Sequence, residues 1–204
     1  MAIFSYQENI SKYSQNTLYF KASTSIKNVK NAIEIMKKSK TPIRTIIVNS
    51  GGGDIRGGMQ LGKYIYNNKL NLIVDKNCYS SCANYLFTAA VTKIVNADSE
   101  VGWHGGTMQP DWKFPQNIPE EQKQLFYKEL ILLKQEEKNF FKHINVNQKI
   151  TYLATIPPYR KQRTSKDCWT YRIKDLKGFG VKNVSFIKNR IYHECDLLVL
   201  DKSE

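Results

Sequence analysis

The stretch T-P-I-R-T-I-I-V-N-S-G-G-G-D, residues 41–54, carries the clearest structural signal in the chain. Its first part is rich in β-branched side chains, which favour a buried β-strand over residues 41–50. The glycines that follow accept backbone angles that other residues avoid, so residues 51–54 are expected to form a turn. Apolar residues then recur at helical spacing, which predicts a helix (Met59, Leu61, Tyr64, Ile65).

The same alternation of strand and helix continues on both sides of this unit. Residues 17–22 favour a short strand, and Ser25 can cap a helix whose apolar residues recur at helical spacing. Downstream, the pattern predicts strands at 71–75, 93–96 and 101–104, with a buried helix at 83–90. This order predicts an α/β domain in which most strands run parallel.

A long helix dominates the second half of the chain. Residues 111–119 contain prolines and aromatics that indicate a loop, and Pro119 starts a helix that extends to about Ile144. Its apolar stripe suits packing on the core or against another subunit, and the sequence leaves both open. Beyond it, we expect a loop (151–166), a short helix (169–180), a strand (181–186) and an edge strand (194–200).

The length and charge limit the class of protein. A chain of 204 residues suits a single domain over 1–204. The formal net charge is +13, and ten Lys and Arg residues fall between Arg160 and Arg190, opposed by only Asp167 and Asp175. This segment is either a solvated face or a surface that attracts nucleic acid or another anionic partner. No nucleic-acid-binding motif accompanies it.

The sequence offers no targeting signal. No apolar run approaches the ~20 residues that a membrane-spanning helix needs. The first ten residues lack the charged leader and apolar segment of a secretory signal. We therefore expect a cytoplasmic protein, or an exported one from which a signal has been removed.

The four cysteines do not indicate a metal site. Cys78 and Cys82 form the single C-x3-C pair, and Cys168 and Cys195 are far apart in the sequence. The three histidines (104, 143 and 193) contain no closely spaced pair of the kind that binds zinc. We expect no metal and no cofactor. Cys78 and Cys82 are either small buried side chains or, in an exported protein, a disulfide.

Three features along the chain together suit acyl transfer. They are the glycine turn N-S-G-G-G-D (49–54), the two serines before a buried helix (80–81), and V-G-W-H-G-G (101–106). A serine needs a base to become a nucleophile, and the carbonyl oxygen that it attacks needs fixed N–H donors. A glycine turn and a helix N-terminus supply such donors, and a histidine at a strand end can act as the base.

These three segments resemble the Clp protease proteolytic subunit and the related signal-peptide-peptidase-like serine peptidases. I-I-V-N-S-G-G-G-D-I-R-G-G resembles the family's strand and I-N-S-P-G-G turn, and C-Y-S-S-C-A-N-Y-L-F-T-A-A resembles its nucleophile segment. V-N-A-D-S-E-V-G-W-H-G-G resembles the segment that carries its base. The resemblance is closest to an outlying branch in which cysteines flank the serine.

The resemblance implies a ClpP/crotonase-like fold, a repeated β-β-α spiral with a long protruding helix. The core would span about 15–110 and 165–190, and the protruding handle helix about 119–144. Carried over by position, the resemblance makes Ser81 the nucleophile, His104 the base and Asp167 the acid that orients it. The backbone N–H groups of Gly53 and Cys82 would hold the oxyanion.

The resemblance also implies partners, and it has departures. It implies a peptide or protein substrate, a homo-oligomer and an unfoldase partner, and hydrolysis of peptide bonds.

The family's turn proline is Gly51 here, and the glycine four positions before the serine is Asn77. Two alternatives remain: a non-catalytic scaffold with a basic surface, and a crotonase-like acyl-CoA enzyme. Some relatives use a Ser–Lys dyad, for which the nearest downstream lysine is Lys93.

Overall fold

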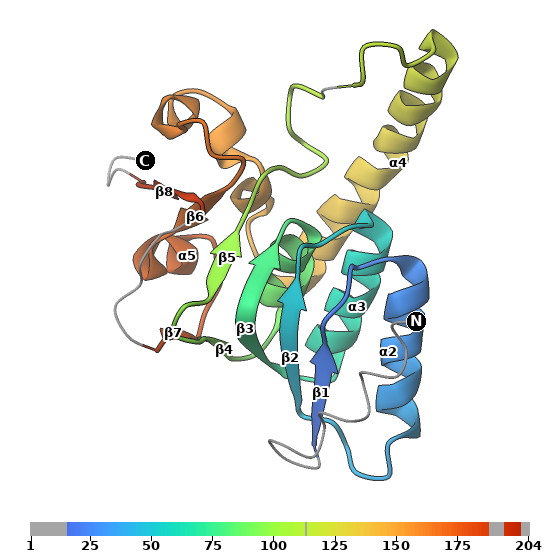
Figure 1. Cartoon of the computed structure of the whole chain (residues 1–204), viewed down its shortest axis with the longest axis vertical. Helices are drawn as coiled ribbons and strands as arrows, with labels where there is room; N and C mark the ends of the chain where they lie inside the picture. Colours follow the sequence, from blue (N-terminus) through green and yellow to red (C-terminus); the bar gives the residue numbers. More distant parts are fainter. Residues whose placement is uncertain (1–15, 113, 188–193, 201–204) are drawn as a thin grey trace.

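A computed structural model describes residues 16–112, 114–187 and 194–200. Two of the ten basic residues between Arg160 and Arg190, Lys188 and Arg190, lie outside these ranges, as do the first ten residues and His193. Within them, strands and helices alternate through the first half, and a long helix leaves the body of the molecule (Figure 1). No helix of the described residues is both long and apolar enough to cross a bilayer.

One parallel sheet forms the centre of the fold. Its strands run in the order β1-β2-β3-β4-β7, and the last half of β3 also pairs with β5. Their bounds are β1 Thr17–Phe20, β2 Thr45–Ser50, β3 Asn71–Tyr79, β4 Lys93–Val95, β5 Glu100–Gly102 and β7 Val184–Phe186. Because β3 pairs with β2 on one side and with β4 and then β5 on the other, its C-terminal end lies at the centre of the sheet.

The helices α2 (Ile26–Lys38) and α3 (Ile55–Asn67) lie side by side against the sheet (Figure 1). Ser25 caps α2, as its position predicted, by accepting the N–H of Asn28 at 3.3 Å. The buried residues of both helices join the core with the apolar side chains of β1, β2 and β3. The expected strand–turn–helix unit and the α/β class are therefore confirmed.

The long helix α4 (Glu120–Ile144) has two unlike halves. Its C-terminal half packs on α3 and buries Phe140, Phe141 and Ile144. Its N-terminal half extends away from the core and leaves large apolar side chains exposed, among them Leu125 and Ile131 (Figure 1). The apolar stripe of α4 therefore packs on the core at its C-terminal end and is exposed to solvent at its N-terminal end.

The C-terminal segments correct two sequence-based predictions. Residues 169–180 are not a continuous helix, because Trp169–Tyr171 forms strand β6 and α5 begins only at Ile173 and ends at Gly178. Within the expected loop 151–166 lie 3-10 turns, and a further one precedes it (η3 Gln148–Thr151, η4 Leu153–Thr155, η5 Tyr159–Gln162). The edge strand is β8 (Asp196–Leu198), which pairs in parallel with β6 instead of joining the main sheet.

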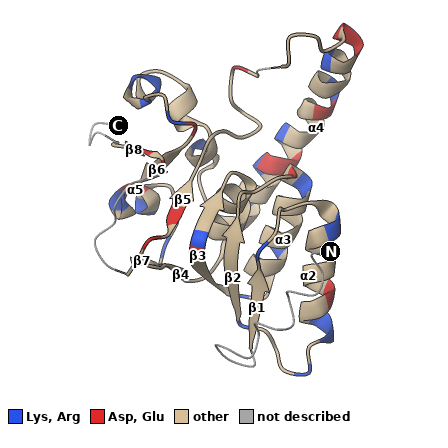
Figure 2. Ribbon diagram, in the orientation of Figure 1, with Lys and Arg blue, Asp and Glu red and all other residues tan. Residues whose placement is uncertain are grey.

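Within the described residues, the basic side chains come from several elements of the fold. Lys and Arg lie on α2, α4, α5 and the segment around η5, and acidic residues alternate with them along α4 (Figure 2). This distribution fits a solvated surface better than a single anion-binding patch.

Candidate active site

The glycine turn between β2 and α3 lies directly against the two serines. Gly52 and Gly53 adopt positive φ angles of 89° and 136°. A Cβ on Gly52 would lie 2.6 Å from the Cβ of Ser80 and 2.7 Å from the backbone nitrogen of Ser81. Only glycine fits there, because both the φ angle and the closeness of Ser80 and Ser81 exclude a side chain.

Hydrogen bonds fix the direction of this turn. Ser50 Oγ accepts the N–H of Gly52 at 3.2 Å, and the Gly52 carbonyl accepts the N–H of Thr24 at 2.9 Å. In a trans peptide the N–H points opposite to the carbonyl, so the N–H of Gly53 faces away from Thr24. Among the described residues, no protein acceptor takes that N–H.

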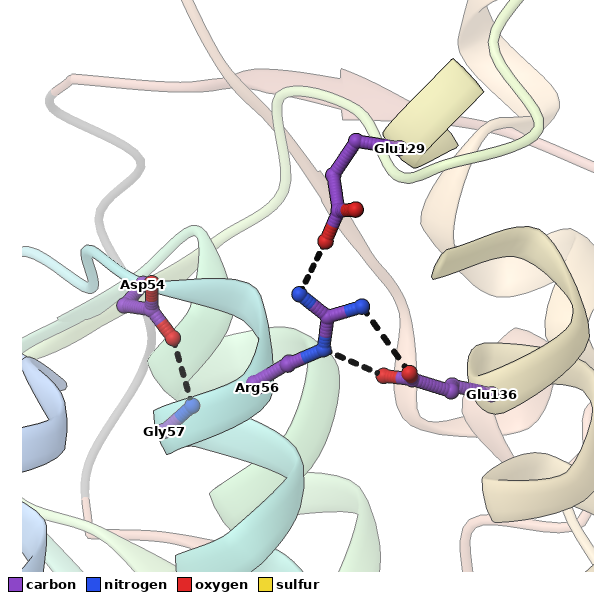
Figure 3. Close-up of polar contacts among 5 residues, drawn as sticks. All are labelled: Asp54, Arg56, Gly57, Glu129 and Glu136. Atoms are coloured by element: carbon purple, nitrogen blue, oxygen red, sulfur yellow. Dashed lines mark hydrogen bonds and ion pairs between the residues drawn. The ribbon is translucent and has the colours of Figure 1, made fainter. Parts of the chain in front are cut away.

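The helix α3 begins immediately after the turn and is tied to α4. Asp54 caps it by accepting the N–H of Gly57 at 2.7 Å. Arg56 then reaches across to α4, where its Nε and Nη2 donate to Glu136 at 2.8 and 2.9 Å and its Nη1 pairs with Glu129 (Figure 3). The hydrogen bonds, first that to Glu136, raise the pKa of Arg56. The start of α3 is thereby attached to the handle helix.

The two serines differ in their surroundings. Ser80 has a positive φ of 57° and is half-buried, and its backbone N–H donates to the Gly102 carbonyl at 3.0 Å. Ser81 is only 2% exposed, and its Oγ donates to the Gly53 carbonyl at 2.9 Å. The predicted nucleophile is therefore adjacent to the glycine turn, but its hydroxyl is engaged.

The segment after the serines is a π-helix, Cys82–Phe87, with every residue buried. The cysteines on either side of the serines form a disulfide, with 5.2 Å between the Cα atoms of Cys78 and Cys82. Of the two possibilities that the sequence left open for this pair, the structure has the bridge. Within the described residues, the N–H of Cys82 also has no protein acceptor.

His104 follows β5 and lies beside Asp167. Trp103 and Trp169 exchange two backbone hydrogen bonds of 2.8 and 2.7 Å, which draws the residues before Trp169 against the end of β5. His104 is exposed, yet the surrounding loops displace part of its hydration. This desolvation lowers the pKa of His104; the positive charge of Arg163 acts in the same direction, and Asp167 opposes it.

Two cavities meet at these residues, and His104 and Asp167 line both. The larger, of about 690 Å³, is also lined by Tyr79, Ser165, Lys166, Cys168 and Glu194. The smaller, of about 370 Å³, is also lined by Gln109, Asp111, Trp112, Ala154, Thr155, Arg160 and Arg163. In the described part of the chain, no hydrogen bond joins His104 to Ser80, Ser81 or Asp167.

The second disulfide lies next to Asp167. Cys168 pairs with Cys195, 27 positions away, with 4.7 Å between their Cα atoms. Together with the Cys78–Cys82 bridge, it leaves no free cysteine. No local pattern predicts this pair beyond an even number of cysteines.

Glu137 was missed by the sequence analysis. This fully buried carboxylate on α4 accepts the hydroxyl of Tyr85 at 2.6 Å, the hydroxyl and N–H of Thr107, and the Gln148 amide at 2.7 Å. Burial, and then Glu137, raise the pKa of Tyr85 well above its usual value. Glu137 thus connects the helix after the serines to the loop after His104. The signal was available, because residue 137 continues the apolar stripe at 133, 140 and 144.

Lys93 is not placed to activate either serine. It lies level with Leu72 in the sheet, whereas the serines follow Tyr79, on the order of 25 Å away along β3 at ~3.3 Å per residue. Its Nζ donates to the Lys182 carbonyl at 2.9 Å, and desolvation lowers its pKa to about 8. Among the described residues, no group of three or more His, Cys, Asp and Glu side chains could hold a metal ion.

Comparisons with known proteins place the fold. No protein-family model matches the sequence, and no curated protein matches it. Among solved structures, a mutant of ClpP1 from Listeria monocytogenes is similar, with a TM-score of 0.52 and 16% sequence identity. The similarity covers 86% of this chain and 93% of that chain. The chain therefore has a ClpP-like mixed α/β fold, as the sequence predicted.

Proposed function

We propose that this ClpP-like fold carries a serine peptidase that hydrolyses peptide bonds. A serine at the end of β3, which the family resemblance assigns to Ser81, is the nucleophile, His104 is the base and Asp167 orients it. The observation that carries the proposal is the contact between the glycine turn and the serines, 2.6 Å from a Cβ built on Gly52 to the Cβ of Ser80. This contact brings the backbone N–H donors of the glycine turn close to the serine hydroxyls.

The electrostatics of His104 suit a general base. Its pKa is lowered by desolvation, so the imidazole is neutral near pH 7 and can accept the proton of a serine hydroxyl. Asp167 favours the protonated ring electrostatically, which is what an orienting acid does once the proton has been transferred. The missing hydrogen bond between serine and histidine fits a resting site that tightens when substrate binds.

The free backbone donors support the same chemistry. The N–H of Gly53 and that of Cys82 have no protein acceptor among the described residues; Gly53 is exposed, whereas Cys82 is fully buried at the start of its helix. A buried donor without a partner costs free energy on folding, and a substrate carbonyl oxygen can supply the missing acceptor.

We extend the proposal to a homo-oligomer that acts on peptide or protein substrates, with an unfoldase as a further partner. The exposed apolar side chains in the N-terminal half of α4, Leu125, Ile131 and Leu132, support contact with a second copy. We also propose an oxidising compartment instead of the cytoplasm. Both disulfides support this, since such bonds persist outside reducing compartments.

A non-catalytic scaffold on the same fold is the second candidate. It is favoured by the exposed histidine that forms no hydrogen bond to either serine in the described residues. Under this alternative, the net charge of +13 would serve an anionic partner.

A fluorophosphonate probe distinguishes the two candidates, because it labels only activated serines. We expect the oxidised protein to be labelled and the His104→Ala variant to be labelled at least ~10³-fold more slowly. His143→Ala is the matched control, because that histidine is bound to Asn67 at 2.8 Å, away from the site. An unlabelled wild-type protein with both disulfides intact would contradict the proposal.

A further inference from the structure

We infer that Ser80, and not Ser81, is the attacking nucleophile; the inference rests on the proposed hydrolase function. The resemblance to the Clp family assigns the nucleophile by counting along the chain from the helix that follows. Three observations indicate that the nucleophile is one residue earlier, at Ser80. They are the backbone conformation, the exposure of the two hydroxyls and the type of the helix.

The backbone conformation singles out Ser80. Its φ of 57° lies in the left-handed region, which residues other than glycine and asparagine seldom occupy. Ser81, by contrast, has helical angles of −57° and −25°. Such strained backbone concentrates at active sites, where a strand must turn sharply into a helix and still present a side chain. Ser80 is the residue at which β3 ends and the helix begins.

The two hydroxyls differ in accessibility. A nucleophile must reach the substrate and give up its proton to a base. The hydroxyl of Ser81 is almost completely buried and already donates its proton to the Gly53 carbonyl at 2.9 Å. Ser80 is half-buried, and within the described residues its hydroxyl has no protein partner. Only Ser80 therefore has a hydroxyl that is free to react.

The π-helix explains why counting along the sequence selects the wrong serine. Residues Cys82–Phe87 form i to i+5 hydrogen bonds, so this segment holds one residue more than an α-helix of the same course. A comparison with a chain whose nucleophile is followed by a regular α-helix would therefore be offset by one residue. Removing that residue moves the nucleophile from Ser81 to Ser80.

The donors around Ser80 fit the reaction. The residue after the nucleophile then supplies one oxyanion donor, the N–H of Ser81, which has no protein acceptor among the described residues. It lies against the glycine turn, 2.7 Å from a Cβ built on Gly52, and Gly53 supplies the second donor. The hydroxyl of Ser81 positions that turn by holding the Gly53 carbonyl. The Cys78–Cys82 disulfide closes a loop with Ser80 at its middle.

The covalent step is then as follows. Ser80 Oγ forms a bond to the carbonyl carbon of the scissile peptide while its proton passes to His104. The carbonyl π electrons move to the oxygen, which accepts the N–H groups of Gly53 and Ser81. The C–N bond breaks, and the amine leaves with the proton from His104. Water hydrolyses the remaining ester through His104, which restores the Ser80 hydroxyl.

The test is to locate the adduct. The oxidised full chain is treated with a fluorophosphonate, in which the serine oxygen displaces fluoride, and the modified residue is identified by fragmentation mass spectrometry. We expect the phosphonyl group on Ser80. Ser80→Ala and Ser80→Gly should lose labelling by at least ~10³-fold. Ser81→Ala should remain labelled, with the label on Ser80. Its hydrolysis of a peptide substrate should show a lower kcat at similar KM.

Each other outcome is decisive. An adduct on Ser81, or labelling that survives in Ser80→Gly but is lost in Ser81→Ala, would overturn the inference and leave the proposed hydrolase intact. A wild-type chain that is not labelled at all would overturn both. Ser80→Gly keeps the experiment interpretable if Ser80→Ala does not fold, because glycine adopts the positive φ without strain.

Discussion

The serines and the histidine of the candidate site are held by contacts of different kinds. The serine half (residues 51–54 and 78–87) is packed so closely that Gly52 leaves no room for a single methyl group, and a disulfide spans the serines. The histidine half (His104 and residues 159–168) is exposed or half-buried and borders two cavities, and the Trp103–Trp169 bridge joins it to the end of β5.

This difference indicates which half is prepared for catalysis in advance. Buried contacts and backbone hydrogen bonds fix the serine half before substrate arrives, as electrostatic stabilisation of an oxyanion requires. The histidine half has room to adjust. We therefore expect a bound peptide or a neighbouring copy to complete the alignment of His104 with the serine.

The largest effect should come from Gly52→Ala in the serine half. The added Cβ would lie 2.6 Å from the Tyr79 carbonyl oxygen and 2.7 Å from the Ser81 nitrogen, and neither backbone atom can move aside. We expect a loss of labelling rate of at least ~10²-fold, because small displacements of reacting groups are this costly. Gly51→Ala is the matched control, since its Cβ would meet nothing within 4 Å. Equal labelling rates for the two variants would refute a preformed serine half.

Glu137→Ala should have the next largest effect, on stability, because Glu137 joins the serine half to the loop after His104. It would leave the buried donors of Tyr85 and Thr107 and the half-buried amide of Gln148 without their acceptor, at a cost of about 3 kcal/mol in the free energy of unfolding. Glu136→Ala, which removes a half-exposed carboxylate paired with Arg56, should cost under about 1 kcal/mol. Urea denaturation measures both, and similar midpoints would count against the role of Glu137.

Removing the two disulfides one at a time should affect stability and activity differently. By loop-closure entropy, the Cys168–Cys195 bridge contributes about 3.5 kcal/mol and the shorter Cys78–Cys82 bridge about 2 kcal/mol. We expect Cys168→Ser/Cys195→Ser to lower the thermal midpoint more, and Cys78→Ser/Cys82→Ser to lower the labelling rate more. The reverse order in either measurement would remove the distinction between the halves.

The smallest effects should appear in the pH profile of the histidine half. Because the pKa of His104 is lowered, more than half of the base is neutral at pH 6.5, and activity should fall at a lower pH than it would with an unperturbed imidazole. Arg163→Ala removes a positive charge and should move the acidic limb of kcat/KM to higher pH. Asp167→Asn should move it to lower pH.

His143→Ala is the matched control for these two variants. Its ring lies by Tyr66 and Asn67, so this change should leave the pH profile of kcat/KM where it is. Shifts of the same sign for Arg163→Ala and Asp167→Asn would contradict the assignment of the charges around His104.

The sheet and the order of the site segments could be predicted because their signals are local. The β-branched run before Gly51, the glycine turn itself and the helical spacing after Asp54 each depend on neighbouring residues. The long helix could likewise be predicted from Pro119 and its periodic apolar residues. The long helix was confirmed within one residue at each end, whereas the strand predicted over residues 41–50 begins only at Thr45.

The features that were missed depend on partners far away in the sequence. Trp169–Tyr171 is a strand because Trp169 pairs with Trp103 and the segment pairs with β8, and no local pattern shows this. Cys168 and Cys195 meet only once that strand pairing exists. The π-helix depends on how Cys82–Phe87 is packed, which the apolar pattern at 83–90 does not reveal.

A crystal structure of the oxidised protein after reaction with a fluorophosphonate would test the central claim most directly. The claim is that the preformed serine half and the adjustable histidine half make one hydrolytic site. We predict an adduct on Ser80 whose phosphoryl oxygen accepts the N–H groups of Gly53 and Ser81, with His104 within ~3 Å of the serine oxygen. An adduct whose oxygen points away from the glycine turn, or a His104 that stays out of reach, would contradict the account.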